Sequence, residues 1–202
     1  MKVDARIEAT RRRLHEAILR LTARKDVSTI SVAELAREAG IDRSTFYAHA
    51  ASPVDVLRSA LSEDLDPLRV EADELVDGTP DAFADAGRML NARLIDHLER
   101  YEAVYADRAS GRPSSALHTV LSDHVRTSLE LVLGHLADLG TGRAQTGTEL
   151  DRSYLAAFIA HGIVGAISVW LNTPAPRDPR QLEAVLDLVY SSWLLPGAQS
   201  PR

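Results

Sequence analysis

A short run of side chains between Arg43 and His49 has the chemistry needed to read DNA. An arginine guanidinium can donate a pair of hydrogen bonds to the O6 and N7 atoms of one guanine, so Arg43 is a candidate for base recognition. Ser44 and Tyr47 follow closely, and their side chains can reach base edges or the thymine methyl group. We therefore predict base contacts from Arg43, Ser44 and Tyr47.

The elements that must position this run are two short helices. Ser31 and Glu34 form a capping box, in which the serine hydroxyl accepts from the amide of residue 34 and the glutamate reaches back, so a helix begins there. Gly40 fits the left-handed position that ends a helix, and Asp42 can cap the next one. The spacing predicts a helix-turn-helix whose second helix runs from Asp42 to about His49.

Helices are also expected on both sides of this pair. Residues 7–24 carry Leu14, Ala17, Ile18 and Leu21 at helical spacing on one face. Ser52 followed by Pro53 is typical of a helix start, because a proline at the first helical position gives up an amide that has no partner there. We expect this fourth helix to run to about residue 67, and we assign Phe46 to the core of the small domain.

Taken in order, the capping box, the glycine turn and the run Ser44-Thr45-Phe46-Tyr47-Ala48-His49 resemble the DNA-binding signature of the TetR repressor family. The resemblance covers about the first 60 residues. It implies that Thr45, Tyr47 and His49 contact phosphates, and that the hydroxyl and free amides at Ser31 face the DNA backbone, where a helix dipole favours an anion. The predicted DNA-binding residues are Ser31, Arg43, Ser44, Thr45, Tyr47 and His49.

Two positions depart from the family pattern. Ala50 stands where relatives usually have an aromatic or bulky apolar residue, and Pro53 stands where a lysine usually holds a phosphate. Because each lost phosphate contact flattens the salt dependence of DNA binding, we expect a weaker electrostatic component than is usual for the family.

The charge is unevenly distributed along the chain. Residues 1–58 hold eleven Lys and Arg against eight Asp and Glu, a net charge of +3, whereas residues 59–202 hold twelve against twenty-one, a net charge of -9. The basic end is therefore the candidate for phosphate contact, although the whole chain has a net charge of -6.

Helical periodicity predicts an all-α protein with about nine helices. Glycine- and proline-containing breaks divide the second part into helices of roughly 81–109, 114–139, 149–172 and 178–195, the first of them bent or split near residue 99. We expect a three-helix helix-turn-helix DNA-binding domain at residues 1–51 and a larger helical domain at residues 52–198.

The resemblance implies that this larger domain forms a homodimer and holds a small-molecule ligand. The segment 149–172 is apolar nearly all round and must be covered on most faces, and 178–195 supplies a second apolar stripe. A four-helix interface between two copies would place two reading helices on a palindromic operator.

Aromatic and polar groups among apolar helices suit a ligand pocket, but the alternative is core packing, which is the commoner role of a histidine on an apolar face. The pocket candidates are Met89, His97, Tyr101, Tyr105, Phe158, His161 and Trp170. The identity of the ligand cannot be read from them.

Other functional classes find little support in the sequence. No serine-hydrolase elbow, metalloprotease motif or phosphate-binding lysine loop is present, and His118 and His124 are not spaced for one helix face, so we expect no enzyme, cofactor or metal site. The chain contains no cysteine and begins with a charged segment, so we expect a cytoplasmic protein. A membrane helix is not expected, since the longest apolar run is short and contains His161.

The expected function is thus a ligand-released transcriptional repressor. The alternative is a DNA-bound scaffold that acts through a protein partner, because one fold can serve both roles.

Overall fold

The computed structural model describes residues 2–75, 80–107, 112–113, 120–138, 148–174 and 176–189. This part of the chain contains nine α-helices, so the predicted all-α fold is confirmed. The first half comprises α1 (Lys2–Thr22), the 3-10 helix η1 (Val27–Thr29), α2 (Val32–Glu38), α3 (Arg43–Tyr47) and α4 (Pro53–Leu75). The second half comprises α5 (Pro80–Arg100), α6 (Glu102–Tyr105), α7 (Ser122–Asp138), α8 (Glu149–Asn172) and α9 (Pro179–Leu188).

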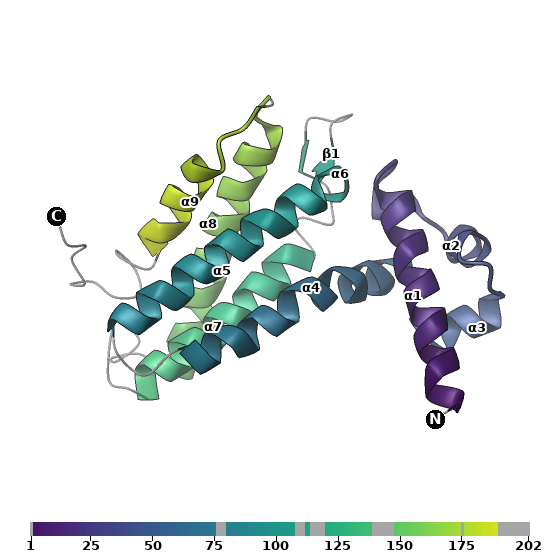
Figure 1. The fold of residues 1–202 in the computed structure, drawn as a ribbon, viewed down its shortest axis with the longest axis horizontal. Helices are drawn as coiled ribbons and strands as arrows, with labels where there is room; N and C mark the ends of the chain where they lie inside the picture. The colour runs from purple at the N-terminus through teal and green to yellow at the C-terminus, as the bar shows by residue number, and fades with distance from the viewer. Residues whose placement is uncertain are drawn as a thin grey trace.

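The molecule is elongated, with α1, α2 and α3 at one end and the bundle of α5 to α9 at the other (Figure 1). The long helix α4 runs from the first group into the second. A two-residue antiparallel strand pair, β1 (Ala106–Asp107) with β2 (Arg112–Pro113), follows α6 and adds a small ribbon that the helical periodicity did not predict.

The core around α1, α2 and α3 is built on the apolar stripe predicted for α1. Leu14, Ala17, Ile18 and Leu21 are all buried, and Phe46 of α3 is completely buried with them. The 3-10 helix η1 packs against α4 and contributes the buried Val27 to the same core. The predicted assignment of Phe46 to this core is confirmed.

Helix α4 is longer than the sequence suggested, because it continues through Pro67 to Leu75. A proline inside a helix removes one hydrogen bond and crowds the preceding turn, so the sequence alone favoured an end at this point. Neighbouring helices support the continuation, since α5 and α7 both pack against α4. Val56 and Leu57 are buried near its start and Leu65 further along, so α4 belongs to the core at both ends of the molecule.

The predicted break near residue 99 is confirmed, because α5 ends at Arg100 and α6 begins at Glu102. In the described part of the chain α7 begins at Ser122, and α8 covers the predicted range 149–172. Helix α9 begins as predicted, whereas residues 190–195 of that prediction and residues 114–119 of the α7 prediction lie outside the described part.

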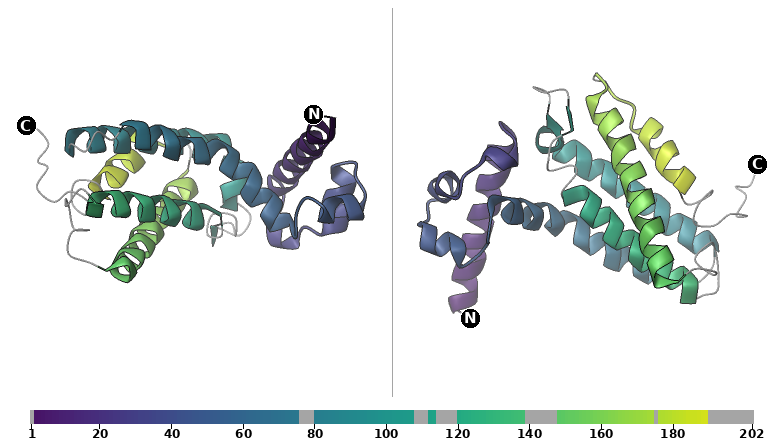
Figure 2. Two further views of the ribbon diagram at one scale, coloured as in Figure 1. Left: turned by 90° about the horizontal axis from the view of Figure 1, so that it is seen from below. Right: turned by 180° about the vertical axis from the view of Figure 1, so that it is seen from behind.

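Helix α8 packs most extensively against α7 and also contacts α9. Its buried face contains Ala156, Ala160, Val164 and Ile167. From Asp151 to Asn172 it is long and apolar enough to cross a membrane by length and composition alone. Figure 2 shows from behind that α8 crosses over the other helices of the bundle, with α9 beside it.

Candidate nucleic-acid interface

The turn between α2 and α3 has the backbone geometry that Gly40 predicted. Gly40 is the only residue in the described part with a positive φ, 65°, in the left-handed region. The Ile41 amide donates to the Ala36 carbonyl at 2.9 Å, and the Gly40 amide donates to the Arg37 carbonyl at 3.2 Å. This pair of bonds is the Schellman motif, which ends α2 and directs the chain into α3.

Each of the two helices is capped by the side chain predicted for it. Ser31 is exposed at the N-terminus of α2, and its hydroxyl accepts from the Glu34 amide at 3.2 Å. Glu34 does not complete the capping box in the structure described, because Lys25 Nζ lies 2.7 and 2.8 Å from its two carboxylate oxygens. The N-cap of α2 is therefore Ser31 alone, and Glu34 ties the helix to the end of α1.

Asp42 organises the start of α3. Its Oδ1 accepts from the Thr45 amide and from the Ser44 hydroxyl, both at 2.7 Å, and its Oδ2 accepts from the Thr45 hydroxyl at 3.1 Å. The Ser44 hydroxyl, followed by the Thr45 donors, lowers the pKa of Asp42 to about 2. Asp42 therefore stays anionic at neutral pH and holds both hydroxyl groups in fixed orientations.

This contact changes what Ser44 and Thr45 can offer to DNA. A hydroxyl group has one proton to donate and two lone pairs that accept. With the protons directed at Asp42, both oxygens present lone pairs, which suit a donor such as an exocyclic base amine better than a phosphate. The sequence could have predicted the contact of both hydroxyl groups with Asp42, because Asp42 precedes Ser44 and Thr45 at the spacing of a helix cap.

Arg43 and Tyr47 are both exposed on α3, as is Ser44. Arg43 is exposed at the first position of the helix, and 63% of Tyr47 is exposed. The Tyr47 ring stands edge-on to the buried Phe46 ring, with 5.5 Å between their centroids, so the core supports one side of the exposed ring. His49 is half-buried just beyond the end of α3.

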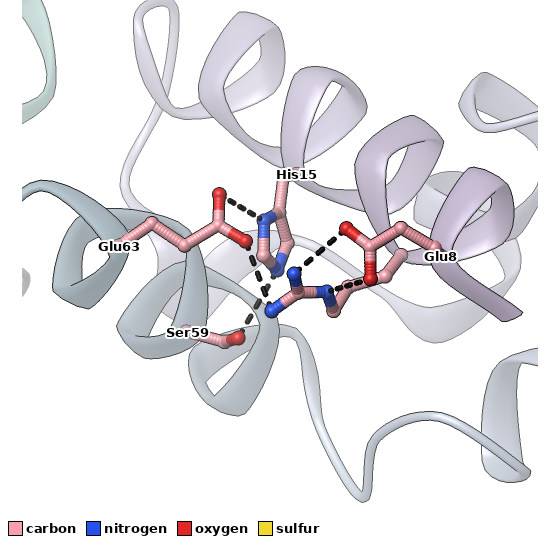
Figure 3. Close-up of polar contacts among 5 residues, drawn as sticks. Glu8, His15, Ser59 and Glu63 are labelled. Atoms are coloured by element: carbon pink, nitrogen blue, oxygen red, sulfur yellow. Dashed lines mark hydrogen bonds and ion pairs between the residues drawn. The ribbon is translucent and has the colours of Figure 1, made fainter. Parts of the chain in front are cut away.

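A cluster of polar side chains, here called the polar joint, connects α1 to α4. It consists of Arg11 and His15 on α1 and of Ser59 and Glu63 on α4. His15 of α1 is buried, with its Nδ1 3.2 Å from a Glu63 carboxylate oxygen and its Nε2 hydrogen-bonded to the Ser59 hydroxyl at 3.1 Å. The other Glu63 oxygen lies 3.0 Å from the Arg11 guanidinium, which also pairs with Glu8 at 2.7 Å. Figure 3 shows His15 between Ser59 and Glu63, with Glu8 further along α1.

The N-terminus of α4 is capped by Ser52, as predicted. Its hydroxyl accepts from the Asp55 amide at 3.2 Å and donates to the Asp55 carboxylate at 2.7 Å. Asp55 also pairs with Arg58 at 3.0 Å. Pro53 occupies the first helical position. This helix start is thus stabilised by acidic and hydroxyl groups, and the proline itself brings no positive charge.

A cavity of about 90 Å³ lies within the helical bundle. Eight aliphatic side chains line it, drawn from α4, α5, α7, α8 and α9, together with Asn91, His124 and Ser128. None of these three polar residues is among the pocket candidates predicted from the sequence, most of which are aromatic. The available signal was Asn91, a polar residue on the otherwise apolar face of α5 that carries Ile95 and Leu98.

The residues predicted for a pocket lie elsewhere. His97 and Tyr105 are buried and hydrogen-bonded to each other at 2.9 Å, and the Tyr101 ring contacts the same His97 ring at a tilt of 55°. Phe158 and His161 are exposed on α8. Met89 is half-buried on α5. Trp170 is buried and donates from its indole nitrogen to the Asp178 carbonyl at 3.2 Å. The 90 Å³ cavity is lined by other residues.

His97 is the residue of this group with an unusual protonation state. Burial lowers its pKa from 6.5 to about 4, against the opposing influence of Asp64, whose carboxylate lies 3.6 Å from His97 Nδ1. Since a carboxylate only accepts, we place the ring proton on Nδ1, which leaves Nε2 to accept from the Tyr105 hydroxyl. His97 is therefore neutral at pH 7. His118 lies outside the described residues, while His124 Nδ1 lies 3.5 Å from Asp66.

Comparison with known proteins supports the fold. By sequence, no family model and no curated protein matches the chain. By structure, a putative TetR-family transcriptional regulator from Syntrophomonas wolfei is similar with a TM-score of 0.61 and 14% identity, over 91% of this chain and 93% of that one. SmeT, the repressor of the Stenotrophomonas maltophilia multidrug efflux pump SmeDEF, has a TM-score of 0.59 and 16% identity, over 95% and 93% of the two chains.

The fatty acid degradation regulator FadR from Bacillus halodurans has a TM-score of 0.57 and 16% identity, over 95% of this chain and 97% of that one. Many of the similar structures are TetR-family transcriptional regulators. The chain therefore has the fold of TetR-family regulators, as the resemblance in its first 60 residues predicted.

Proposed function

We propose that this protein is a DNA-binding transcriptional repressor that a small molecule releases from a palindromic operator. The observation that carries the proposal is the α2–Gly40–α3 unit, which is capped at both helix starts and presents Arg43 and Tyr47 at one end of an elongated molecule. In this proposal residues 1–51 bind DNA, and residues 52–198 bind the ligand and a second copy of the chain.

Helix α3 enters the major groove, where base pairs differ in their hydrogen-bonding patterns. Arg43 donates to guanine, Tyr47 contacts a base edge or a phosphate, and Ser44 accepts from an exocyclic amine while Asp42 holds its proton. Thr45 and His49 lie at the edge of this surface, and Ser31 offers the free amides of α2 to the DNA backbone.

A homodimer supplies the second reading helix. The exposed apolar residues Tyr154, Phe158 and Val169 of α8 follow one helix face, with Gly162 and Gly165 exposed between them. Helix α9 contacts α8 and exposes Val185 and Leu188. An apolar face of this kind is typical of a surface that another protein chain covers, and a two-fold pairing of α8 and α9 would cover it.

Release requires that the ligand bind the DNA-free conformation more tightly than the DNA-bound one. Helix α4 is suited to couple the ligand cavity to the DNA-binding helices. Leu65 lines the cavity, while Val56 and Leu57 are buried near the start of the helix, where α1 packs. A ligand that shifts α4 would change the separation of the two reading helices in the dimer.

Titration of the full-length protein onto DNA from its own promoter, followed by fluorescence polarisation with excess non-specific competitor DNA, tests the proposal. We expect saturable binding that Tyr47→Ala weakens at least about tenfold, since exposed aromatic contacts at recognition surfaces carry energies of this size. Leu131→Ala removes an equally exposed apolar side chain from α7 and should leave binding unchanged.

Equal loss in both variants, or binding that the competitor removes, would contradict operator recognition. Specific binding that a ligand bound to the bundle leaves unchanged would favour the alternative, a DNA-bound scaffold that acts through a protein partner. The proposal further places the protein in the cytoplasm and assigns it no catalytic role and no cofactor.

A further inference from the structure

The cavity in the bundle combines an aliphatic lining with a small polar wall. Leu65, Ile163 and Leu186 bring α4, α8 and α9 to it, and the polar wall consists of Asn91 on α5 and of His124 and Ser128 on α7. Ligand sites of this kind bind the apolar body of a molecule by burial and select its polar group by hydrogen bonding. The hydrogen-bonding state of the wall therefore indicates which polar group fits.

Asn91 presents an acceptor. The residue is only 4% exposed, and its Nδ2 donates to an Asp187 carboxylate oxygen at 2.8 Å. This assignment of the amide is fixed by chemistry, because a carboxylate at neutral pH can only accept. The amide oxygen is then the acceptor that Asn91 brings to the cavity wall. A ligand group that donates to this oxygen forms a hydrogen bond, whereas a ligand group that only accepts does not, so a donor is favoured here.

Ser128 presents a second acceptor. Its hydroxyl donates to the His124 carbonyl of the preceding helical turn at 2.9 Å. That bond uses the single hydroxyl proton and leaves the oxygen lone pairs for an incoming donor. Asn91 and Ser128 thus offer the same kind of atom from two different helices.

Two carboxylates lie behind the polar wall. Asp187 is paired with Asn91, and an Asp66 oxygen lies 3.5 Å from His124 Nδ1. Among the described residues that line the cavity, none is lysine or arginine. Among the described lining residues His124 is the one able to carry a positive charge, and it already faces the Asp66 carboxylate, so desolvating a ligand carboxylate here is unfavourable.

We infer that the effector of this protein is a small, mainly apolar molecule whose polar group is a hydrogen-bond donor, a hydroxyl or an ammonium group, and not a carboxylate. The inference rests on the proposed ligand-responsive function, and it specifies the chemistry of the ligand site. Asn91 and Ser128 determine the specificity, while the aliphatic lining supplies affinity that does not depend on the polar group.

Four probes with one apolar body separate these contributions: toluene, benzyl alcohol, benzylammonium and benzoate. Binding to the full-length, DNA-free protein is measured by isothermal titration calorimetry and by ligand-observed NMR at pH 7. We expect benzyl alcohol or benzylammonium to bind about tenfold or more tightly than benzoate, the ratio expected for one buried hydrogen bond gained against one group left unpaired.

Ser128→Ala should reduce the preference for benzyl alcohol or benzylammonium over benzoate by about threefold to tenfold, because one acceptor is removed. The affinity for toluene, which forms no hydrogen bond, should not change. Asn91→Leu should reduce it further, and circular dichroism checks that this variant folds. Ser62→Ala is the matched control, since Ser62 is half-buried on α4 outside the cavity lining. Asp187→Asn should weaken benzylammonium more than benzyl alcohol if the charge behind Asn91 contributes.

Benzoate binding as tightly as benzyl alcohol, equal preference in wild type and Ser128→Ala, or no binding of any probe would each overturn the inference. These measurements contain no DNA, so a failure of operator binding leaves them interpretable. Conversely, a protein that binds its operator but fails this series is still a DNA-binding regulator, with a different effector or none.

Discussion

At the scale of single residues, Arg43 has the most specific chemistry on the proposed reading surface. It is exposed, and its planar guanidinium can form a fork of hydrogen bonds that a lysine cannot reproduce. We predict that Arg43→Lys weakens operator binding by about tenfold, within the range of 1–3 kcal/mol for a bidentate base contact, while non-specific binding changes little because the charge is kept.

Parallel titrations on operator and on scrambled DNA at one salt concentration measure this ratio. Arg24→Lys is the matched control, because Arg24 is also exposed but lies after the end of α1. If Arg43→Lys weakened binding to both DNAs equally, Arg43 would be a phosphate contact and its assignment to a guanine would be wrong.

His97 leads to a prediction about pH. Because burial lowers its pKa from 6.5 to about 4, the unfolded chain takes up a proton as the pH falls below 6.5, whereas the folded chain does not until about pH 4. Proton uptake by the unfolded state alone destabilises the fold, so the contribution of His97 to stability decreases across this window as the pH falls. At pH 5 the expected decrease is about 2 kcal/mol relative to pH 7.5.

Urea unfolding of wild type and His97→Gln at pH 7.5, 6.0 and 5.0 isolates this contribution at a fixed protein concentration. Glutamine cannot titrate but can still accept from the Tyr105 hydroxyl. The difference in unfolding free energy between the two proteins should shrink toward acid pH. Parallel pH profiles would mean that His97 is protonated in the folded protein near its ordinary pKa.

At the scale of elements, the polar joint connects α1 with α4 through side chains of both helices. Glu63 of α4 faces both the Arg11 guanidinium and Nδ1 of the buried His15. The ion pair with Arg11 is partly exposed and contributes little, whereas the Glu63 carboxylate 3.2 Å from the buried His15 Nδ1 is the closer electrostatic contact, although the two atoms are not aligned for a hydrogen bond. We predict that Glu63→Ala lowers the free energy of unfolding by about 1–2 kcal/mol.

Urea unfolding measures the stability of the Glu63→Ala variant. Operator titration measures whether the same change affects DNA binding. Glu8→Ala is the matched control, because Glu8 pairs with the same Arg11 within α1, whereas Glu63 pairs with it from α4 (Figure 3). We expect Glu8→Ala to leave both stability and operator affinity nearly unchanged. Equal effects of the two variants would show that the Arg11 pair, and not His15, stabilises the joint.

At the scale of the whole molecule, the exposed apolar face of α8 and α9 is the surface that the proposed homodimer would cover. Phe158 is 63% exposed and Val169 is 72% exposed on the same face of α8. A charge placed there would be buried in the proposed dimer without a counter-charge, which costs several kcal/mol. We predict that Phe158→Arg converts the dimer to a monomer and abolishes cooperative binding to a two-site operator.

Sedimentation velocity at micromolar protein concentration measures the oligomeric state directly. Ile7→Arg is the matched control, since Ile7 is 49% exposed but lies on α1 at the other end of the molecule. A wild-type protein that sediments as a monomer would contradict the proposed interface, and so would a Phe158→Arg variant that stays dimeric.

The sequence by itself was sufficient for the helix-turn-helix. Ser31, Gly40 and Asp42 act on their own backbone neighbours, so their spacing fixes where α2 ends and α3 begins. The apolar stripe of α1 was equally readable, because periodicity alone identifies a buried helix face. The contact of Ser44 and Thr45 with Asp42 was also local and could have been predicted from the same cap.

Other features were decided only by tertiary packing. Helix α4 continues through Pro67 where neighbouring helices pack along it, and the joint brings together His15 and Glu63 from two helices. The cavity likewise joins Leu65, Asn91 and Leu186, which no local pattern connects. Local backbone geometry is determined by residues a few positions apart, whereas the walls of a cavity depend on how whole helices cross, and that is settled by the burial of many side chains at once.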